Sequence, residues 1–161
     1  MLIIRNAKSD ELDEIYAIEA ECYTEAEAAA KDAMGQRIKI NNETFLVAEL
    51  GGKIVGHING PAVESGYVVD DLYKETLPSI KTGGVQTVLG LAVCPDYRRH
   101  GIAGKMLNEL ANIARANNRK YITLSCKDEL IKYYEKQGYT KVGKSDSCLG
   151  GEVWYDMNMY L

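Results

Sequence analysis

The order of strand-like and helix-like segments along the 161 residues predicts an α/β domain around one mixed sheet. A Gly-Gly pair at 51–52 separates two strand-like runs, which is typical of an antiparallel hairpin because its tight turn needs positive φ twice. A nearly unbroken apolar run over 85–93 indicates a strand covered on both faces. We therefore expect a single domain over residues 1–161, with about seven strands and four helices.

The N-terminal part of the chain supplies the first strand and two helices. Leu2–Arg5 is a short strand candidate. Ser9 and Asp10 offer N-cap oxygens for a helix whose apolar residues follow at helical spacing over 12–22. A second helix, rich in Ala and Glu, is predicted from Glu25 to about Ile38.

The middle of the chain contains the hairpin and an irregular segment. Thr44–Leu50 and Lys53–Asn59 are the strands that the Gly-Gly turn joins. Residues 61–84 include Pro61, Pro78 and several glycines. A segment of this length inside a compact domain is usually functional or mobile, so we expect it to be mobile without ligand.

The second half of the chain alternates strands and helices. The predicted elements are the strand Val85–Val93, the helix Ile102–Ala116, the strand Tyr121–Ser125, the short helix Asp128–Gln137, and the strands Tyr139–Val142 and Glu152–Leu161. The longer helix has a broad apolar face, and Gly138 is a usual residue for ending the shorter one.

Composition and charge argue against several classes of protein. The net charge is −4, whereas a nucleic-acid binder needs a positive field, so no nucleic-acid partner is expected. No apolar run reaches membrane-spanning length and the N-terminus turns polar at once, so we expect a cytoplasmic protein with no membrane partner. Four dispersed cysteines and two histidines form no zinc pattern, so we expect free thiols and no metal.

The stretch over 91–107 carries the most chemical information. An apolar strand ends at Val93, and the basic pair Arg98 and Arg99 then precedes a helix that opens with small residues at Gly101 and Ala103. Helix N-termini expose unpaired N–H groups and a positive dipole end, and small residues let an anion approach them. The stretch thus predicts a phosphate or pyrophosphate site, and a solvated basic turn is the alternative when the loop is taken alone.

Two motifs resemble those of the GCN5-related N-acetyltransferase (GNAT) superfamily. Arg98-x-x-Gly101-x-Ala103, preceded by Leu91-Ala-Val, is similar to its acyl-CoA-binding motif. The segment Lys132–Tyr139 resembles a second motif, and the element order along the whole chain also matches. More narrowly, residues 25–29, 83–84 and 126–134 are similar to arylalkylamine (serotonin-type) N-acetyltransferases.

The resemblance implies a splayed sheet with acetyl-CoA, and no metal, in the V between two parallel strands. These would be Val85–Val93 and Tyr121–Ser125. The Gly90–Val93 backbone would pair with the pantetheine amides, and backbone N–H groups over 99–104 would hold the pyrophosphate. The residues assigned to the cofactor are Leu91, Ala92, Val93, Arg98, Arg99, His100, Gly101, Ile102, Ala103, Gly104, Leu130 and Tyr133.

Tyr134 matches the family's general-acid tyrosine. A phenol of pKa about 10 keeps its proton at neutral pH and can pass it to the departing CoA thiolate. The alternative is that Tyr134 is only a core-facing member of a stripe with Leu130 and Ile131.

The chain departs from the arylalkylamine pattern at the proton relay. Those enzymes carry two histidines on the strand before the Leu-Ala-Val match, where this chain has Thr87 and Leu89, and neither residue can titrate. His57 is the remaining histidine near the sheet. It is a candidate for the base that removes the amine proton, and the alternative is that it is a surface or packing residue. The other route for the amine proton is a water chain that leads to solvent or to a carboxylate such as Glu25 or Asp70.

The expected reaction is acetyl transfer from acetyl-CoA to a primary amine by direct attack in a ternary complex. Tyr23, Glu25, Tyr67 and Asp70 are candidates for the acceptor pocket, as aromatic walls or as carboxylates that attract an ammonium. The acceptor would be a small-molecule amine or, alternatively, a protein N-terminus or lysine. A CoA-binding sensor domain without an acceptor is the alternative from another class. The protein would act as a monomer or a homodimer.

Overall fold

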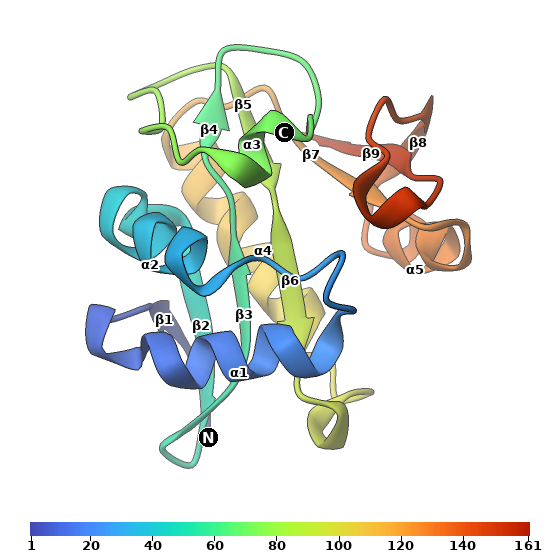
Figure 1. Cartoon of the computed structure of the whole chain (residues 1–161). Coiled ribbons are helices and arrows are strands. Elements are labelled where there is room, and N and C mark those ends of the chain that lie inside the picture. The colour runs from blue at the N-terminus through green and yellow to red at the C-terminus, as the bar shows by residue number, and fades with distance from the viewer.

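The computed structural model describes residues 1–161 and has the expected mixed α/β architecture (Figure 1). The helices are α1 (Leu12–Cys22), α2 (Lys31–Ile40), α3 (Asp71–Lys74), α4 (Ile102–Ala116) and α5 (Ile131–Lys136). The strands are β1 (Leu2–Asn6), β2 (Phe45–Leu50), β3 (Lys53–Asn59), β4 (Ala62–Val63), β5 (Val85–Val88), β6 (Gly90–Val93), β7 (Tyr121–Cys126), β8 (Thr140–Lys144) and β9 (Tyr155–Tyr160).

The strands form two sheets that diverge. Their orders are β1-β2-β3-β6 and β4-β5-β7-β9-β8. Only β5 and β7 pair in parallel, and every other pair is antiparallel. The Gly51–Gly52 hairpin between β2 and β3 is present, with both glycines at positive φ as the turn requires.

The predicted strand Val85–Val93 is in fact two strands in different sheets. β5 pairs with β4 and β7, whereas β6 pairs only with β3. The change occurs at Leu89, whose N–H donates to the Asn59 carbonyl at 2.8 Å, while Thr87 N–H donates to the Pro61 carbonyl at 3.0 Å. The apolar run could not reveal this break, because both strands are covered on their faces.

The predicted helix from Glu25 to Ile38 is wrong at its start. α2 begins at Lys31, and residues 24–30 form turns. The Ala29 N–H donates to the Glu19 carboxylate at 2.9 Å, so a tertiary contact fixes this backbone in place of the helix that its alanines favour.

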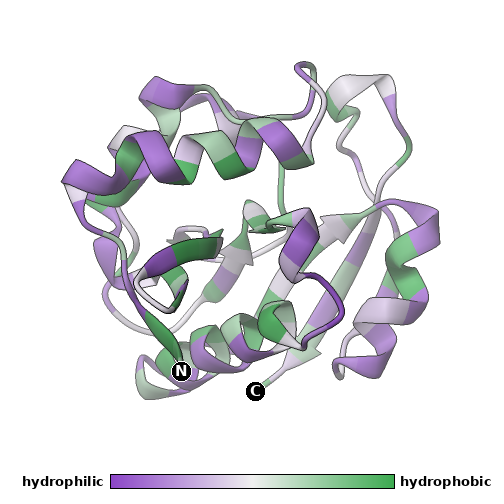
Figure 2. Ribbon diagram, turned by 90° about the horizontal axis from the view of Figure 1, so that it is seen from below, coloured by the Kyte–Doolittle hydropathy of each residue, from purple (hydrophilic) through white to green (hydrophobic).

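The first sheet has a hydrophobic cluster on each face. Alternate side chains of β2 point to opposite faces, so Leu46 and Ala48 pack toward α4, while Phe45 and Val47 pack toward α1 and α2. Figure 1 shows α1 in front of this sheet and α4 behind it. The longest helix, α4, turns its apolar residues toward the sheet (Figure 2), and no helix has the length and apolar character needed to cross a bilayer.

The irregular segment 61–84 is anchored along its C-terminal part. Arg119 donates to the carbonyls of Ile80 and Gly83, each at 2.9 Å. Asn41 donates to the Leu77 carbonyl at 2.9 Å and accepts from the Ser79 N–H at 2.8 Å. Residues 64–76 are tied to the rest of the domain mainly through Gly66, whose carbonyl accepts from the Tyr121 hydroxyl at 2.9 Å, and Asp70, whose carboxylate accepts from Ser147, and we expect a response to ligand within this part.

Hydrogen exchange tests this division of the segment. Amides over 77–84 should be protected with or without ligand, because Arg119 and Asn41 hold their backbone. Amides over 64–76 should exchange faster than those over 77–84 in the free protein, with α3 the slowest part because its amides are hydrogen-bonded, and should slow down with a CoA–amine bisubstrate analogue. Equal exchange over 64–76 in the two states would contradict the prediction, and Arg119→Ala should raise exchange over 80–84 as a control.

Candidate active site

The divergence of the sheets leaves one edge of β6 without a partner strand. In the register with β3, Cys94 N–H donates to the Val55 carbonyl at 2.8 Å. Because every second residue of an antiparallel strand bonds its neighbour, the N–H and C=O groups of Leu91 and Val93 point away from β3. They form a short peptide edge that an extended amide chain can pair with.

Side chains already donate to this edge. The Tyr23 hydroxyl donates to the Leu91 carbonyl. Arg98 Nε donates to the Val93 carbonyl at 3.1 Å, and the Cys22 thiol lies 3.4 Å from the same oxygen. These contacts show that both carbonyl groups are accessible acceptors on the open side of the strand.

A cavity of about 480 Å³ lies along this edge, between β6 and α5. Most of the residues predicted to bind the cofactor line it: Leu91, Ala92, Val93, Arg98, Arg99, Gly101, Ile102, Ala103, Leu130 and Tyr133. His100 and Gly104 do not line it. His100 is exposed, and Gly104 is buried against α5, where a Cβ atom would lie 3.0 Å from Gln137 Oε1.

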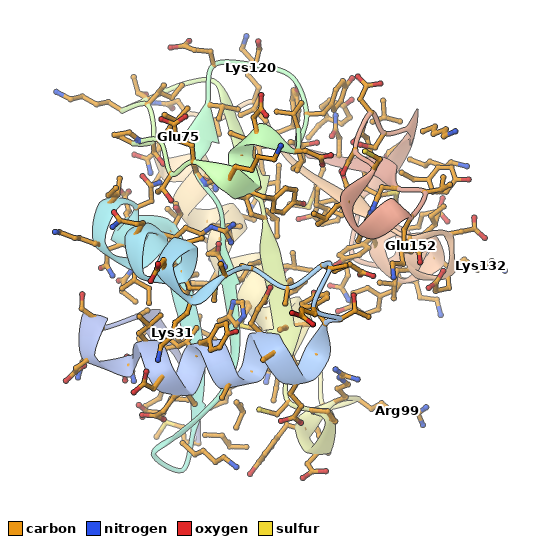
Figure 3. All side chains as sticks on the ribbon, in the orientation of Figure 1. Lys31, Glu75, Arg99, Lys120, Lys132 and Glu152 are labelled. Atoms are coloured by element: carbon orange, nitrogen blue, oxygen red, sulfur yellow. The ribbon has the colours of Figure 1, made fainter.

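One end of the cavity is the turn that leads into α4. Arg99 and Gly101 both adopt positive φ, of 67° and 75°. A Cβ atom on Gly101 would meet nothing within 4 Å, so the space above the helix start is open. Arg99 extends outward from this turn (Figure 3). The free N–H groups of the first helical turn and the two arginines suit a pyrophosphate.

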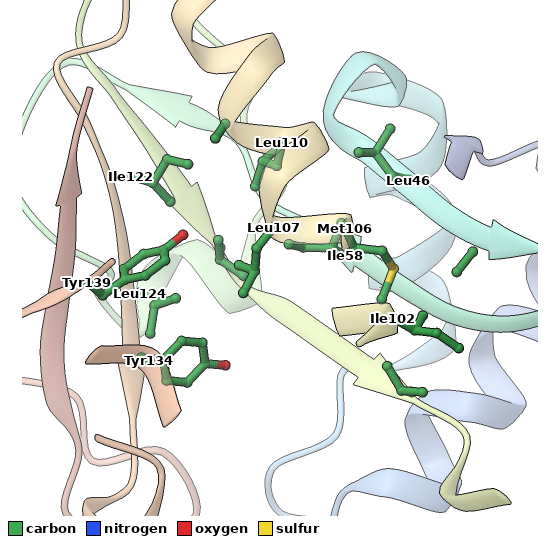
Figure 4. Packing of buried hydrophobic residues seen from close by; sticks show 14 of the residues in the cluster. Leu46, Ile58, Ile102, Met106, Leu107, Leu110, Ile122, Leu124, Tyr134 and Tyr139 are labelled. Atoms are coloured by element: carbon green, nitrogen blue, oxygen red, sulfur yellow. The ribbon is translucent and has the colours of Figure 1, made fainter. Parts of the chain in front are cut away.

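Tyr134 lies at the inner end of the cavity and is only 8% exposed. The rings of Tyr133 and Tyr139 pack against it edge to face, with centroids 5.2 and 5.8 Å away. Figure 4 shows its hydroxyl pointing from α5 toward β6. Burial raises the pKa of Tyr134 well above 10, so the phenol keeps its proton at neutral pH.

A second, inner cavity of about 60 Å³ lies on the other side of the gap. It shares Tyr23, Leu91 and Tyr134 with the first cavity. Its other walls carry two carboxylates and two aromatic side chains, which are Glu19, Glu27, Tyr73 and Trp154. The two cavities thus meet at Leu91 and Tyr134.

An outer groove of about 690 Å³ continues the inner cavity to the surface. The two share Glu27, Tyr73 and Leu149. The groove runs past Asp32 and Glu75, so its mouth is mainly anionic. The groove and the first cavity share no lining residue.

The structure brings only Tyr23 of the four predicted acceptor residues into these cavities. Glu25 is exposed, close in sequence to Glu27 of the groove. Tyr67 is 41% exposed and follows Gly66, whose carbonyl accepts a hydrogen bond from the Tyr121 hydroxyl. Asp70 accepts from the Ser147 hydroxyl and from the Cys148 N–H at 3.2 Å, which lowers the pKa of its carboxyl. Asp70 therefore ties the segment before α3 to the loop before β9.

Sequence reasoning missed Glu19, Glu27, Tyr73 and Trp154 as lining residues. For Glu19 a signal was present: it follows Ile15 by four residues and Ile18 by one, so it lies on the apolar face of the helix. A carboxylate on a face that is otherwise buried is an unusual feature. Nothing in the pattern marked Tyr73 or Trp154, because the long segments that carry them are positioned by tertiary contacts.

Comparison with known proteins identifies the family. The model of the acetyltransferase (GNAT) family matches residues 12–139. The chain belongs to the GNAT family. The predicted superfamily is therefore confirmed, whereas the narrower arylalkylamine resemblance stays a prediction. No curated protein matches this GNAT chain.

Solved structures share the fold of this GNAT protein at low sequence identity. Naa50 from Arabidopsis thaliana, in complex with the bisubstrate analogue CoA-Ac-MVNAL, has 14% identity and a TM-score of 0.77, over 99% of each chain. Ard1 from Thermoplasma volcanium has 18% identity and a TM-score of 0.75, over 99% of this chain and 97% of that one. The GNAT-like decarboxylase GphF, in complex with isobutyryl-CoA, has 17% identity and a TM-score of 0.83, over 98% of each chain.

Substitution of Gly101 tests the pyrophosphate assignment. Gly101→Glu should weaken acetyl-CoA binding by about 100-fold or more, because a carboxylate at the helix start repels the anion. Gly101→Ala is the control, since it carries the same strain from positive φ without the charge, and its affinity should fall less than about tenfold. Calorimetry measures both, and a Kd for Gly101→Glu near that of the wild type would remove the assignment.

Proposed function

We propose that this protein transfers an acetyl group from acetyl-CoA to a primary amine by direct attack in a ternary complex. The observation that carries the proposal is the meeting of two separately opening cavities at Leu91 and Tyr134. One has the peptide edge and helix start that fit an acyl-CoA, and the other has carboxylates that fit a cationic acceptor. The two substrates can therefore be bound at once, with their reacting groups together.

The residues of β6 and α4 would bind the CoA. Leu91 and Val93 present free N–H and C=O groups that match the pantetheine amides, which would replace the donors from Tyr23 and Arg98. The N–H groups over 99–104 would hold the pyrophosphate. Arginines and backbone N–H groups can bind a pyrophosphate directly. The structure has no group of three or more His, Cys, Asp or Glu side chains placed to hold a metal ion.

Tyr134 would act as the general acid. The amine nitrogen attacks the thioester carbonyl carbon, the N–C bond forms and the C–S bond breaks, and the thiolate takes the phenol proton. The tyrosinate then recovers a proton from the new amide nitrogen. A phenol with a raised pKa remains protonated until the thiolate forms, which suits this role.

The cysteines favour direct transfer over an acyl-cysteine intermediate. Burial raises the pKa of Cys126 to about 11 and also raises the pKa values of Cys22 and Cys94. The thiolate is the nucleophilic form, so these thiols are poorly reactive at neutral pH.

The size of the outer groove supports a second candidate acceptor, a peptide or protein amine. Naa50 shares the fold and was solved with a peptide bisubstrate analogue, and the groove beside α3 has room for residues that follow a terminal amine. Decarboxylation of an acyl-CoA, the activity that GphF's name gives, fits less well. Glu19 and Glu27 would repel a substrate carboxylate in the inner cavity.

CoA thiol release from acetyl-CoA tests the proposal. The acceptors would be alkylamines, arylalkylamines, free lysine and short peptides with free N-termini. Release that depends on an amine supports transfer, and preference among these classes identifies the acceptor. Binding of acetyl-CoA without release on any acceptor would instead establish a CoA-binding sensor.

Replacement of the general acid gives the sharpest kinetic prediction. Tyr134→Phe should lower kcat by about 10²- to 10⁴-fold, because the proton donor is lost, and should leave the Kd of acetyl-CoA within about twofold. Tyr139→Phe is the matched control: its hydroxyl is buried without a hydrogen-bond partner and its ring packs on Tyr134, so kcat should be unchanged. A fall in kcat of less than threefold for Tyr134→Phe, with chemistry rate-limiting, would make Tyr134 a packing residue.

A further inference from the structure

The inner cavity contains a buried carboxylate that has no lysine or arginine partner. Glu19 is 4% exposed and lines the cavity beside Tyr23 and Tyr73. Its only ion-pair contact is with His57, at 3.2 Å. A buried carboxylate is costly unless its charge is balanced, so the nature of this contact decides what the cavity can accept.

A chain of hydrogen bonds connects Glu19 to Arg37 through His57 and Asn59. Arg37 Nη1 donates to Asn59 Oδ1 at 3.3 Å, which directs the amide nitrogen of Asn59 to His57 Nδ1, also at 3.3 Å. In this arrangement Nε2 of the ring faces the Glu19 carboxylate at 3.2 Å and donates to it. The Ala29 N–H donates to the other carboxylate oxygen at 2.9 Å. His57 and the Ala29 N–H thus fix Glu19 in place, and no lysine or arginine touches its carboxylate.

The nearby cations do not balance this charge directly. Arg37 is separated from Glu19 by two side chains, and burial lowers the pKa of Arg37. Lys127, close to the cavity, is paired with Glu27 at 2.9 Å. The other titratable groups that face Glu19 are Cys22, Tyr23 and Tyr73. Burial raises the pKa values of these three groups, so they are uncharged at neutral pH.

We propose that Glu19 is the counter-ion of the acceptor's amino group, and that the acceptor is an alkylammonium-type primary amine with no carboxylate beside the amine. This inference rests on the proposed acetyl transfer. Glu19 reaches the cavity that also contains Tyr134 and Leu91, so the nitrogen it binds lies next to the acyl site. An α-amino acid would place its own carboxylate beside Glu19, where Lys127 is already paired with Glu27, so it should bind less well than the simple amine.

The same contact would assist the chemical step. The bound ammonium first gives one proton to solvent water, because only the neutral amine has a lone pair. When this amine attacks the carbonyl carbon, its nitrogen gains positive charge, and it then gives its second proton to the Tyr134 tyrosinate. A fixed carboxylate next to that nitrogen stabilises the developing charge without having to reorient. His57 is a positioning residue here, since it touches Glu19 and not the cavity.

Three probes of similar shape test the proposal on the CoA-bound protein, where no acetyl group can be transferred. Butylamine is the cation, 1-butanol is its neutral analogue, and norvaline is butylamine with an added α-carboxylate. Titrations followed by NMR should give butylamine a Kd about tenfold or more below those of both other probes. Equal affinities for butylamine and 1-butanol would overturn the proposal, and so would tighter binding of norvaline.

Glu19→Gln keeps the shape and removes the charge, and its single amide oxygen can accept one of the two hydrogen bonds that Glu19 accepts. The preference for butylamine over 1-butanol should fall below threefold, and kcat/KM for butylamine should fall by about 30-fold or more, with the Kd of acetyl-CoA unchanged. Glu14→Gln, at an exposed carboxylate on the same helix α1, is the matched control and should alter none of these values. A Glu19→Gln protein that keeps the cation preference would overturn the proposal.

The outcomes separate this inference from the proposed function. If no amine releases CoA from acetyl-CoA, acetyl transfer fails, while the probe affinities still report on Glu19. If transfer occurs and Glu19→Gln is as active as wild type, only the counter-ion role fails. If Glu19→Gln does not fold, the three probe affinities of the wild-type protein decide the question alone.

Discussion

The break between β5 and β6 at Leu89 is the constraint on which the site depends. Up to this residue the chain belongs to the sheet with β7, and beyond it to the sheet with β3. Neither sheet can close over the gap, because β6 has no partner on its second edge. The unpaired backbone of Leu91 and Val93 follows from this, and so do the two cavities that meet there.

The residues behind the break form a polar core that fixes the gap from one side. Gly90 shows how closely they approach, because a Cβ atom there would lie 2.8 Å from Asn59 Nδ2 and 3.4 Å from His57 Cε1. Only a residue without a side chain lets β6 pass in front of this network. The network in turn points its donors at Glu19, so the geometry of the strand break and the charge of the inner cavity are linked.

The aromatic cluster on α5 fixes the gap from the other side. Tyr134 is held edge to face by two neighbouring rings, and its burial keeps the phenol protonated. The same low polarity keeps Cys126 a thiol. A protonated phenol, unreactive thiols and a nearby carboxylate are the features on which the proposed transfer to an amine rests.

Local pattern was enough to predict most helices and strands, the hairpin at Gly51–Gly52 and the residues over 91–103 that lie along the larger cavity. These are properties of short segments: alternation, helical spacing, and small residues at a helix start after a basic pair. The family motifs added two predictions, the GNAT fold and the selection of Tyr134 as a site residue. The rings that pack on Tyr134 belong to Tyr133 and Tyr139, which are also close to it in sequence.

Only the tertiary structure decided the acceptor side. Glu19 and His57 are 38 residues apart, and the walls of the inner cavity come from segments that share no local pattern. The helix predicted from Glu25 starts late because Glu19 captures the Ala29 N–H, a contact that no propensity of the segment itself could show. Likewise the Asp70 carboxylate accepts a hydrogen bond from Ser147, whereas the Glu19 carboxylate lines a cavity. Carboxylates are alike in sequence, and their chemistry depends on which distant donors and cavities surround them after folding.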